Sequence, residues 1–211
     1  MRLLQQAAPE LKATQGRLLD VGCDTGEFME LLGQTIGWDA SGLDVASRAV
    51  QEACRVGRKA FHCDLSHAPL HLGDFDLITA IDLIEHVADP AALTVATRQR
   101  LKAGGLFYFE TPNIDSAVYR IGALMCQWLR GHPKALYERL FPPQHVHYFN
   151  RISLEALMNR CGFEKVVLAS RPLPWQEIST SFAVRSALAP LQSYDRLLDR
   201  GIILYGLFRA V

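Results

Sequence analysis

The segment that most constrains the fold of this chain is the glycine turn of residues 20–26, Asp-Val-Gly-Cys-Asp-Thr-Gly, which follows the apolar residues Leu18 and Leu19. An apolar run that stops at an acid, turns through glycines and continues into the helical pattern of residues 27–32 predicts a strand, a tight turn and a helix. Glycine lets the backbone fold tightly and approach a ligand that a side chain would hold away. The turn therefore predicts a ligand site where the first strand ends.

Strands and helices alternate along the first half of the chain at the spacing of parallel βαβ units. With the first strand at 17–21 and its helix from residue 27, we expect strands at 38–44, 59–63, 75–81 and 106–111 and helices at 46–56 and 90–102. Residues 75–81 are an almost continuous apolar run, which suits a strand that is covered on both faces of a sheet. The pattern predicts an α/β protein with a doubly wound, mostly parallel sheet.

After the fifth strand this alternation gives way to a helical insertion. Apolar spacing predicts helices at 118–129 and 133–140, and we expect the insertion to form a lid over about residues 114–145. With 211 residues, of which 49% are hydrophobic, the chain is long enough for one domain with a substantial core. We therefore expect a single domain, residues 1–211, with a homodimer contact through the helices of residues 114–140.

The alternation returns toward the C-terminus. We expect a helix at 153–161 with Ser153 as its N-cap, and an edge strand at 202–208. The other expected elements are a helix at 2–14, a strand at 163–170 and a helix at 176–199. The sheet then has seven strands.

Charge and cysteine content exclude several classes of protein. Lys plus Arg and Asp plus Glu both number 22, so no basic excess points to a nucleic-acid partner. The five cysteines show no C-x-x-C spacing, which favours free thiols in a reducing compartment over disulfides or a zinc site. The N-terminal residues are too polar for a signal peptide, and no run of about 20 apolar residues spans a membrane. We expect a cytoplasmic protein that binds no nucleic acid.

The glycine turn departs from the dinucleotide fingerprint G-x-G-x-x-G. Gly22 and Gly26 are present, but Asp24 stands where the second glycine is expected. A carboxylate beside the backbone amides repels a pyrophosphate, and Asp20 adds to that repulsion. About twenty residues later Asp44 ends the second strand, where an acid can bind a ribose. These residues favour a nucleoside cofactor that is positively charged and has no phosphate, such as S-adenosylmethionine.

Further motifs follow the glycine turn in a fixed order within residues 17–112. They are Leu-Leu-Asp20-Val-Gly22-Cys-x-Thr-Gly26, Gly-Leu-Asp44, Cys-Asp64-Leu, Phe-Asp76-Leu-Ile, Glu85-His86-Val and Leu-Lys102-x-Gly-Gly-Leu. This ordered set resembles the class I S-adenosylmethionine-dependent methyltransferases, and most of all the bacterial enzymes that methylate sugars and quinone precursors. The resemblance implies a Rossmann-like fold and the transfer of a methyl group from S-adenosylmethionine to a small-molecule acceptor.

The resemblance also implies a set of cofactor-binding residues. These are Asp20, Gly22, Cys23, Asp24, Gly26, Asp44, Val45, Asp64, Leu65 and Asp82. Asp44 is expected to accept hydrogen bonds from both ribose hydroxyls, with an N-cap of the following helix as the alternative. Asp64 and Leu65 are expected to meet the adenine. Asp24 stands where family members more often have glycine, and if the turn needs a positive φ there, Asp tolerates it better than most residues.

His145 and His147 are the candidate catalytic residues. They alternate, so both rings face the same side of an extended segment, and the resemblance places their loop over the acceptor pocket. An imidazole with a pKa near neutrality can take the proton from a hydroxyl group as it attacks the methyl group. The alternatives are hydrogen bonds that hold the loop in place and a metal site. Because no acid stands beside the pair as a third ligand, we expect no metal.

Two other functions are consistent with parts of the sequence. One is a non-catalytic module that binds S-adenosylmethionine and presents the helices of residues 114–140 to a partner. The other is a nicotinamide-dependent dehydrogenase with a variant glycine loop, which the missing fingerprint disfavours. His86 is expected to cap or to pack beneath the cofactor rather than to act in catalysis.

Overall fold

The computed structural model describes residues 15–69, 72–128, 134, 138, 141–172 and 182–211. The helix expected at 2–14 lies outside these residues, as does most of the one expected at 133–140. Among the described residues, no helix has both the length and the apolar character needed to cross a membrane.

The elements alternate as the sequence predicts. They are β1 (Arg17–Val21), α2 (Glu27–Ile36), β2 (Asp39–Asp44), α3 (Ser47–Arg55), β3 (Ala60–His62), the 3₁₀ helix η2 (Leu65–His67), β4 (Phe75–Ile81), α4 (Pro90–Arg100), β5 (Leu101–Pro112), α5 (Ala117–Trp128), α7 (Arg151–Arg160), β6 (Phe163–Arg171), α9 (Phe182–Leu197) and β7 (Ile203–Ala210). This order confirms the doubly wound α/β fold with seven strands and the helical insertion, α5, after the fifth strand.

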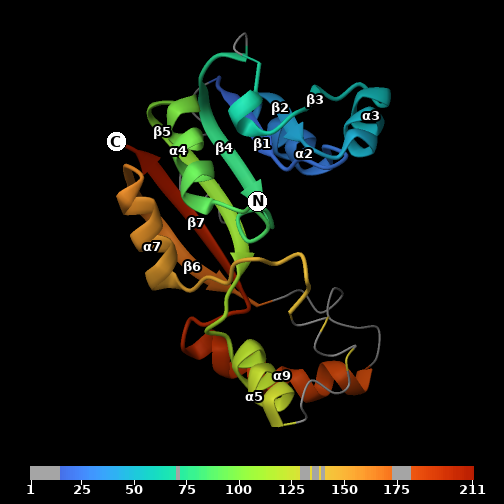
Figure 1. Cartoon of the computed structure of the whole chain (residues 1–211), viewed down its shortest axis with the longest axis vertical. Helices are drawn as coiled ribbons and strands as arrows, with labels where there is room; N and C mark the ends of the chain where they lie inside the picture. Colours follow the sequence, from blue (N-terminus) through green and yellow to red (C-terminus); the bar gives the residue numbers. More distant parts are fainter. Residues whose placement is uncertain (1–14, 70–71, 129–133, 135–137, 139–140, 173–181) are drawn as a thin grey trace.

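The strands form one sheet in the order β3-β2-β1-β4-β5-β7-β6. The five adjacent strands β3, β2, β1, β4 and β5 are parallel to one another, whereas β7 is antiparallel to both of its neighbours. The chain builds outward in one direction from β1 and in the other direction from β4, so the strand order reverses between these two strands (Figure 1). In open sheets of this kind ligands bind outside the carboxyl ends of the strands at the reversal. Here those ends carry the glycine turn and Asp82.

The prediction of an edge strand at 202–208 is wrong. β7 lies between β5 and β6, and β6 forms the edge of the sheet. Leu204 and Phe208 pack on one face of the sheet and Leu207 packs on the other, so β7 is buried on both faces. A strand buried in this way reads as a continuous apolar run, and the sequence of β7 is such a run.

Several element boundaries also differ from the prediction, and contacts in the structure explain two of them. The helix expected to reach residue 102 ends at Arg100, because Leu101 already pairs with Phe75 in the sheet. The N-cap of α7 is Asn150 rather than Ser153. Asn150 Oδ1 accepts a hydrogen bond from Ser153 N at 2.9 Å, and Ser153 Oγ accepts one from Asn150 N at 3.0 Å. This reciprocal capping box starts the helix two residues earlier than expected.

Helices cover both faces of the sheet. One face packs against α4, α7 and η2 in a cluster that includes Leu93, Met158 and Leu65. The other face packs against α2, whose Leu32 belongs to the same buried cluster as Leu18 of β1. The alternation of side chains along each strand supplies both clusters. Packing on both faces fixes β1 and β4 side by side, and so fixes the position of the turns that follow them.

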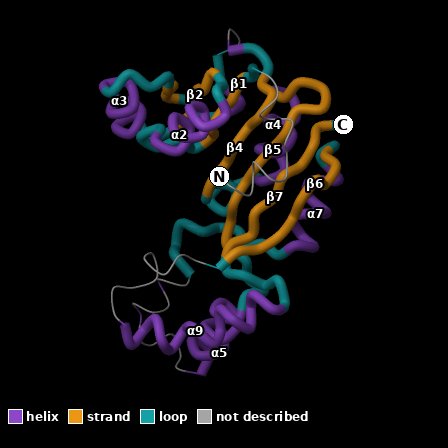
Figure 2. Tube along the Cα trace, turned by 180° about the vertical axis from the view of Figure 1, so that it is seen from behind, coloured by secondary structure: helices purple, strands orange, loops and turns teal. Residues whose placement is uncertain are grey.

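A pair of helices, α5 and α9, lies beyond the carboxyl ends of the parallel strands (Figures 1 and 2). Asp195 of α9 is 2% exposed, and its two carboxylate oxygens accept hydrogen bonds from Ala117 N at 2.8 and 3.0 Å. Ala117 is the first residue of α5, and the helix dipole stabilises a negative charge at this end of the helix. The insertion and the C-terminal helix are thereby joined through one buried carboxylate.

Gly42 in β2 makes room for the glycine turn, and it carries a stability prediction. A Cβ at residue 42 would lie 2.5 Å from Cys23 Sγ and 2.8 Å from Met29 Sδ, and both of these side chains are buried. We expect Gly42→Ala to lower the free energy of unfolding by about 1–3 kcal/mol, the usual cost of overpacking, in urea denaturation. In a Cys23→Gly background the same substitution should cost less, because both clashing atoms of Cys23 are gone, Sγ and the Cβ that would lie 2.7 Å away. An equal cost in both backgrounds would contradict the clash.

Candidate functional site

The glycine turn joins β1 to α2 through three residues in the left-handed region. The φ angle is 75° at Gly22, 47° at Asp24 and 80° at Gly26, so the turn does require a positive φ at Asp24. The N–H groups of Gly22 and Cys23 both donate to Leu43 O, at 2.8 and 3.0 Å, and tie the turn to β2. A Cβ at Gly22 would approach Leu83 Cδ1 to 3.0 Å. Leu83, which follows β4, is a neighbour of the turn that sequence reasoning missed.

Asp44 braces this turn from the end of β2. Its Oδ2 accepts a hydrogen bond from Asp24 N at 2.8 Å, and its Oδ1 accepts one from Ala46 N at 2.7 Å. The N-cap of α3 is Ala46, so Asp44 holds the residue before the helix rather than capping its first turn. Each carboxylate oxygen can accept a further hydrogen bond. The geometry therefore leaves Asp44 able to take hydroxyl donors as well as to hold the turn.

Asp20 places a second carboxylate at the same strand end. It is 3% exposed, and its Oδ1 accepts a hydrogen bond from Thr79 Oγ1 at 2.6 Å. Burial raises the pKa of Asp20 to about 7; the hydrogen bond from Thr79 opposes this rise and the charge of Asp44 adds to it. Two carboxylates in such surroundings favour a positively charged ligand.

The other predicted cofactor residues lie at the carboxyl ends of β2, β3 and β4. Asp64 caps η2 through hydrogen bonds from Ser66 Oγ at 2.6 Å and His67 N at 2.9 Å, and the bonds from Ser66 and His67 lower its pKa to about 2. Leu65 is buried in the core, whereas Val45 is exposed. Asp82 has a φ of 47° and donates its N–H to Glu110 O at 3.0 Å.

His145 and His147 lie in the loop before α7, but their rings contact different groups. His147 Nε2 lies 3.3 Å from Ala88 O, and its ring packs near Phe149. The ring of His145 meets that of His86 edge to face, with 4.6 Å between the centroids. His145 is therefore the one of the two predicted histidines whose ring packs against that of His86.

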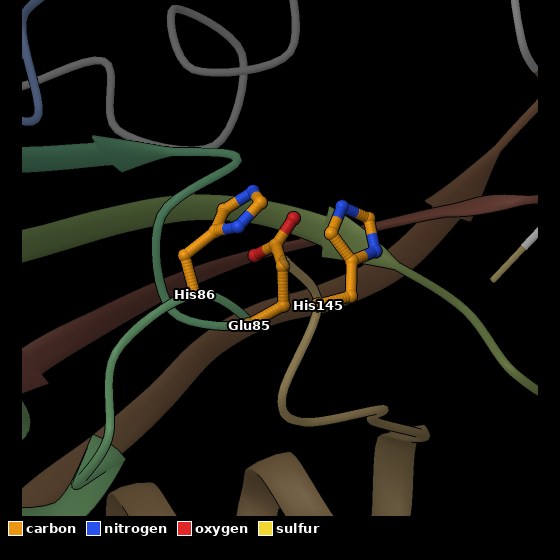
Figure 3. Close-up of side chains that lie close together, drawn as sticks. All are labelled: Glu85, His86 and His145. Atoms are coloured by element: carbon orange, nitrogen blue, oxygen red, sulfur yellow. The ribbon is translucent and has the colours of Figure 1, made fainter. Parts of the chain in front are cut away.

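Glu85 lies at the centre of this region, although the sequence analysis gave it no role. Figure 3 shows its carboxylate between the rings of His86 and His145. The residue is 1% exposed, and burial raises the pKa of its carboxyl. Its backbone O accepts hydrogen bonds from Val146 N at 2.9 Å and His147 N at 3.1 Å, which hold the histidine loop against the end of β4. The one sequence signal for this role was the Glu-His pair after the fourth strand.

The ring of Tyr148 lies beside that of His145 and packs with the rings of Tyr119 and Phe141. Tyr148 is 5.9 Å from His145, and Tyr119 of α5 is 6.3 Å from Tyr148 and 5.7 Å from Phe141, measured between ring centroids. Burial raises the pKa of Tyr119 to about 12, so its hydroxyl stays protonated near neutral pH. The rings form an apolar wall that joins the insertion to the histidine loop.

Comparison with known proteins finds methyltransferases among the similar sequences. A family model described as a methyltransferase domain matches residues 1–168. The ubiquinone biosynthesis O-methyltransferase of Thiobacillus denitrificans is 29% identical over 120 residues, which are 54% of this chain and 51% of that protein. The enzyme of the same name from Nitrosococcus oceani is 28% identical over 182 residues, 81% of this chain and 76% of that protein. The chain thus spans about half the length of the first relative.

Solved structures show the same fold. A SAM-dependent methyltransferase from Archaeoglobus fulgidus superposes with a TM-score of 0.65 at 17% identity, over 99% of this chain and 91% of that one. One from Mesorhizobium loti gives 0.61 at 22% identity, over 96% and 97%. A plantazolicin methyltransferase in complex with SAH gives 0.65 at 17% identity, over 99% and 81%. The family model matches most of the chain, and the glycine turn lies at the reversal of strand order. We conclude that the chain belongs to the methyltransferase-domain family.

Proposed function

We propose that this chain is an S-adenosylmethionine-dependent methyltransferase that acts on a small-molecule acceptor. The observation that carries the proposal is the glycine turn after β1, which Asp44 holds through the N–H of Asp24 at the reversal of strand order. The relatives named as O-methyltransferases and the similar fold solved with SAH support it. A nicotinamide-dependent dehydrogenase does not agree with the family match.

The residues around the turn fit this cofactor. Gly22 and Gly26 present bare backbone, and the carboxylates of Asp20 and Asp44 favour a cation. We propose that Asp44 binds the ribose hydroxyls and that the residues of the turn hold the methionine end. Cys23, Val45, Asp64, Leu65 and Asp82 complete the proposed cofactor site. When bound, S-adenosylmethionine supplies an electrophilic methyl group on its sulfonium.

The chain itself aligns the acceptor and receives its proton. We propose that the aromatic wall of Tyr119, Phe141 and Tyr148 shields the acceptor from water, as part of a lid over about residues 114–145 in a single domain. His145 is the histidine placed to act on the acceptor's hydroxyl group. Burial and the neighbouring His86 lower the pKa of His145, so its ring is neutral at pH 7 and can accept a proton. His147, close to Ala88 O, holds the loop in place.

A hydroxyl oxygen of a quinone precursor is the acceptor class that the relatives' names favour, with sugar hydroxyls as the second class. The test is transfer of a labelled methyl group from S-adenosylmethionine to a hydroxylated aromatic acceptor or to a sugar. We expect one labelled product for each S-adenosylhomocysteine formed. Tight binding of S-adenosylhomocysteine without transfer to either class would instead favour a non-catalytic binding module.

The surface of α5 supports the expected homodimer. Leu124, Met125 and Trp128 are exposed, with 87% of Trp128 accessible to solvent. Apolar side chains gathered on one helix are commonly covered by association. The cytoplasmic location and the lack of a nucleic-acid partner stay predictions; the first agrees with five cysteines that are free thiols and the second with a net charge of zero.

A further inference from the structure

Glu85, His86 and His145 form a cluster of potential metal ligands. Each offers one ligand atom, and these atoms all lie within 4.8 Å of one another. Glu85 and His86 follow β4, whereas His145 comes from the loop before α7, about sixty residues later. Figure 3 shows the carboxylate between the two imidazole rings. The expectation of no metal rested on the lack of an acid next to His145 in sequence, and the fold supplies that acid from a distant segment.

Hydrogen bonds already hold these side chains in position. His86 Nδ1 lies 2.9 Å from Gln144 O, and a ring N–H that donates to this carbonyl leaves Nε2 as a lone-pair donor. Glu85 Oε2 accepts a hydrogen bond from Thr111 Oγ1 at 2.9 Å. Partners of this type, which orient a ligand through its second polar atom, are the usual surroundings of metal-binding histidines and carboxylates.

Two buried polar atoms in the cluster have no hydrogen-bond partner among the residues that the structure describes. They are Glu85 Oε1 and His145 Nδ1. An unpaired buried carboxylate oxygen is unfavourable, since burial removes its hydration and nothing replaces it. A cation between the carboxylate and the rings would satisfy the oxygen and favour the charged carboxylate.

We propose that Glu85, His86 and His145 bind a divalent transition-metal ion, with Zn²⁺ as the ion that best matches two imidazole nitrogens and one carboxylate oxygen. Ligand bonds of about 2.0–2.1 Å in a tetrahedral site place the ligand atoms roughly 3.4 Å apart. The cluster reaches that spacing by small side-chain rotations, because its atoms now lie within 4.8 Å of one another. Three protein ligands leave the fourth position open.

The open position is where a hydroxyl oxygen of the acceptor binds, and this part of the inference rests on the proposed function. A bound cation lowers the pKa of such a hydroxyl, so its proton passes to solvent. The oxygen lone pair then forms the new C–O bond, the methyl carbon leaves the sulfur, and the pair of that bond stays on sulfur. His145 then serves as a ligand rather than as the base.

The test is a calorimetric titration of chelator-treated, full-length protein with Zn²⁺. We expect one ion per chain, and at least a tenfold weaker affinity in both His145→Ala and Glu85→Gln. His67→Ala is the control, since this exposed histidine lies on η2 outside the cluster, and it should keep wild-type affinity for Zn²⁺. Titration with Co²⁺ then separates nitrogen and oxygen ligands from the free thiols through the visible spectrum. Absence of a stoichiometric ion in the wild type, or unchanged binding in His145→Ala, would overturn the site.

Binding of S-adenosylhomocysteine to the same samples separates this inference from the proposed function. We expect His145→Ala to lose the ion and keep S-adenosylhomocysteine, and Asp44→Ala to do the reverse. If the wild type binds the ion but not S-adenosylhomocysteine, the proposed function is wrong and the metal site is still supported. S-adenosylhomocysteine binding without the ion overturns the metal site alone. Circular dichroism of each variant shows that the fold is retained, and His145→Ala serves as the test if Glu85→Gln does not fold.

Discussion

Replacing Asp44 with alanine is expected to weaken the binding of S-adenosylhomocysteine at least tenfold. The carboxylate has two tasks, since it accepts hydrogen bonds from Asp24 N at 2.8 Å and Ala46 N at 2.7 Å while it is proposed to bind the ribose. Hydrogen bonds to a charged group contribute about 1.5–3 kcal/mol each, and a tenfold change in affinity corresponds to about 1.4 kcal/mol. Loss of the ribose bonds alone reaches the tenfold limit, and a loosened glycine turn adds to it. Isothermal titration calorimetry measures the change.

Asp39→Ala is the matched control for this experiment. Asp39 begins the same strand, is exposed and forms an ion pair with Lys59 at the surface. Such pairs contribute little to stability, and this one lies at the opposite end of β2 from the turn. We expect the Asp39 variant to bind S-adenosylhomocysteine within twofold of the wild type. If Asp44→Ala also stays within twofold, the ribose assignment of Asp44 is wrong.

A fall in the free energy of unfolding between pH 5 and pH 8 is the second large effect that we expect. Burial raises the pKa of Asp20 from 3.8 to about 7, so the folded chain keeps a proton that the unfolded chain releases. The contribution of Asp20 to stability is therefore greatest at low pH, falls as the pH rises above the pKa of the unfolded chain, and levels off above about 7. One pKa unit is worth about 1.4 kcal/mol, so the share of Asp20 over this range is on the order of 3 kcal/mol.

Asp20→Asn should remove the pH-dependent contribution of this residue to stability while keeping the packing. The amide oxygen of asparagine can still accept the hydrogen bond from Thr79 Oγ1. Urea denaturation of the wild type and of Asp20→Asn at pH 5, 6, 7 and 8 gives, for each protein, the slope of the free energy of unfolding against pH. Burial also raises the pKa of Glu85, which adds in the same sense, whereas the lowered pKa of His145 acts in the opposite sense. Equal slopes in the wild type and in Asp20→Asn would show that Asp20 is charged throughout.

The glycine turn and the strands around it were predictable because each is encoded within a few residues. Gly22, Gly26 and Asp24 indicate a turn with positive φ angles, and the apolar runs on either side indicate strands. Capping was harder to place, because Asn150 and Ser153 both suit an N-cap and the reciprocal bonds between them decide the helix start. The local chemistry thus predicted the fold class and the glycine turn.

Contacts between distant segments account for what the sequence did not reveal. The place of β7 between β5 and β6 depends on strand pairing across more than thirty residues, which no local pattern records. The same holds for Glu85 and His145, which come together because the backbone of the histidine loop bonds to Glu85 O. His145 and His147 look equivalent in sequence, and the fold alone separates their surroundings.

The hydrogen bonds between Asp195 and the first residue of α5 have a consequence for exchanging parts between relatives. Because the donor is a backbone N–H, a chimera that keeps α9 of this chain leaves the buried acid unpaired wherever the foreign insertion begins its helix at a different position. Transfer of acceptor preference is therefore expected to require both segments, residues 113–150 and 182–200, moved as one unit. The two segments are far apart in the chain, yet they form a single exchangeable part of the protein.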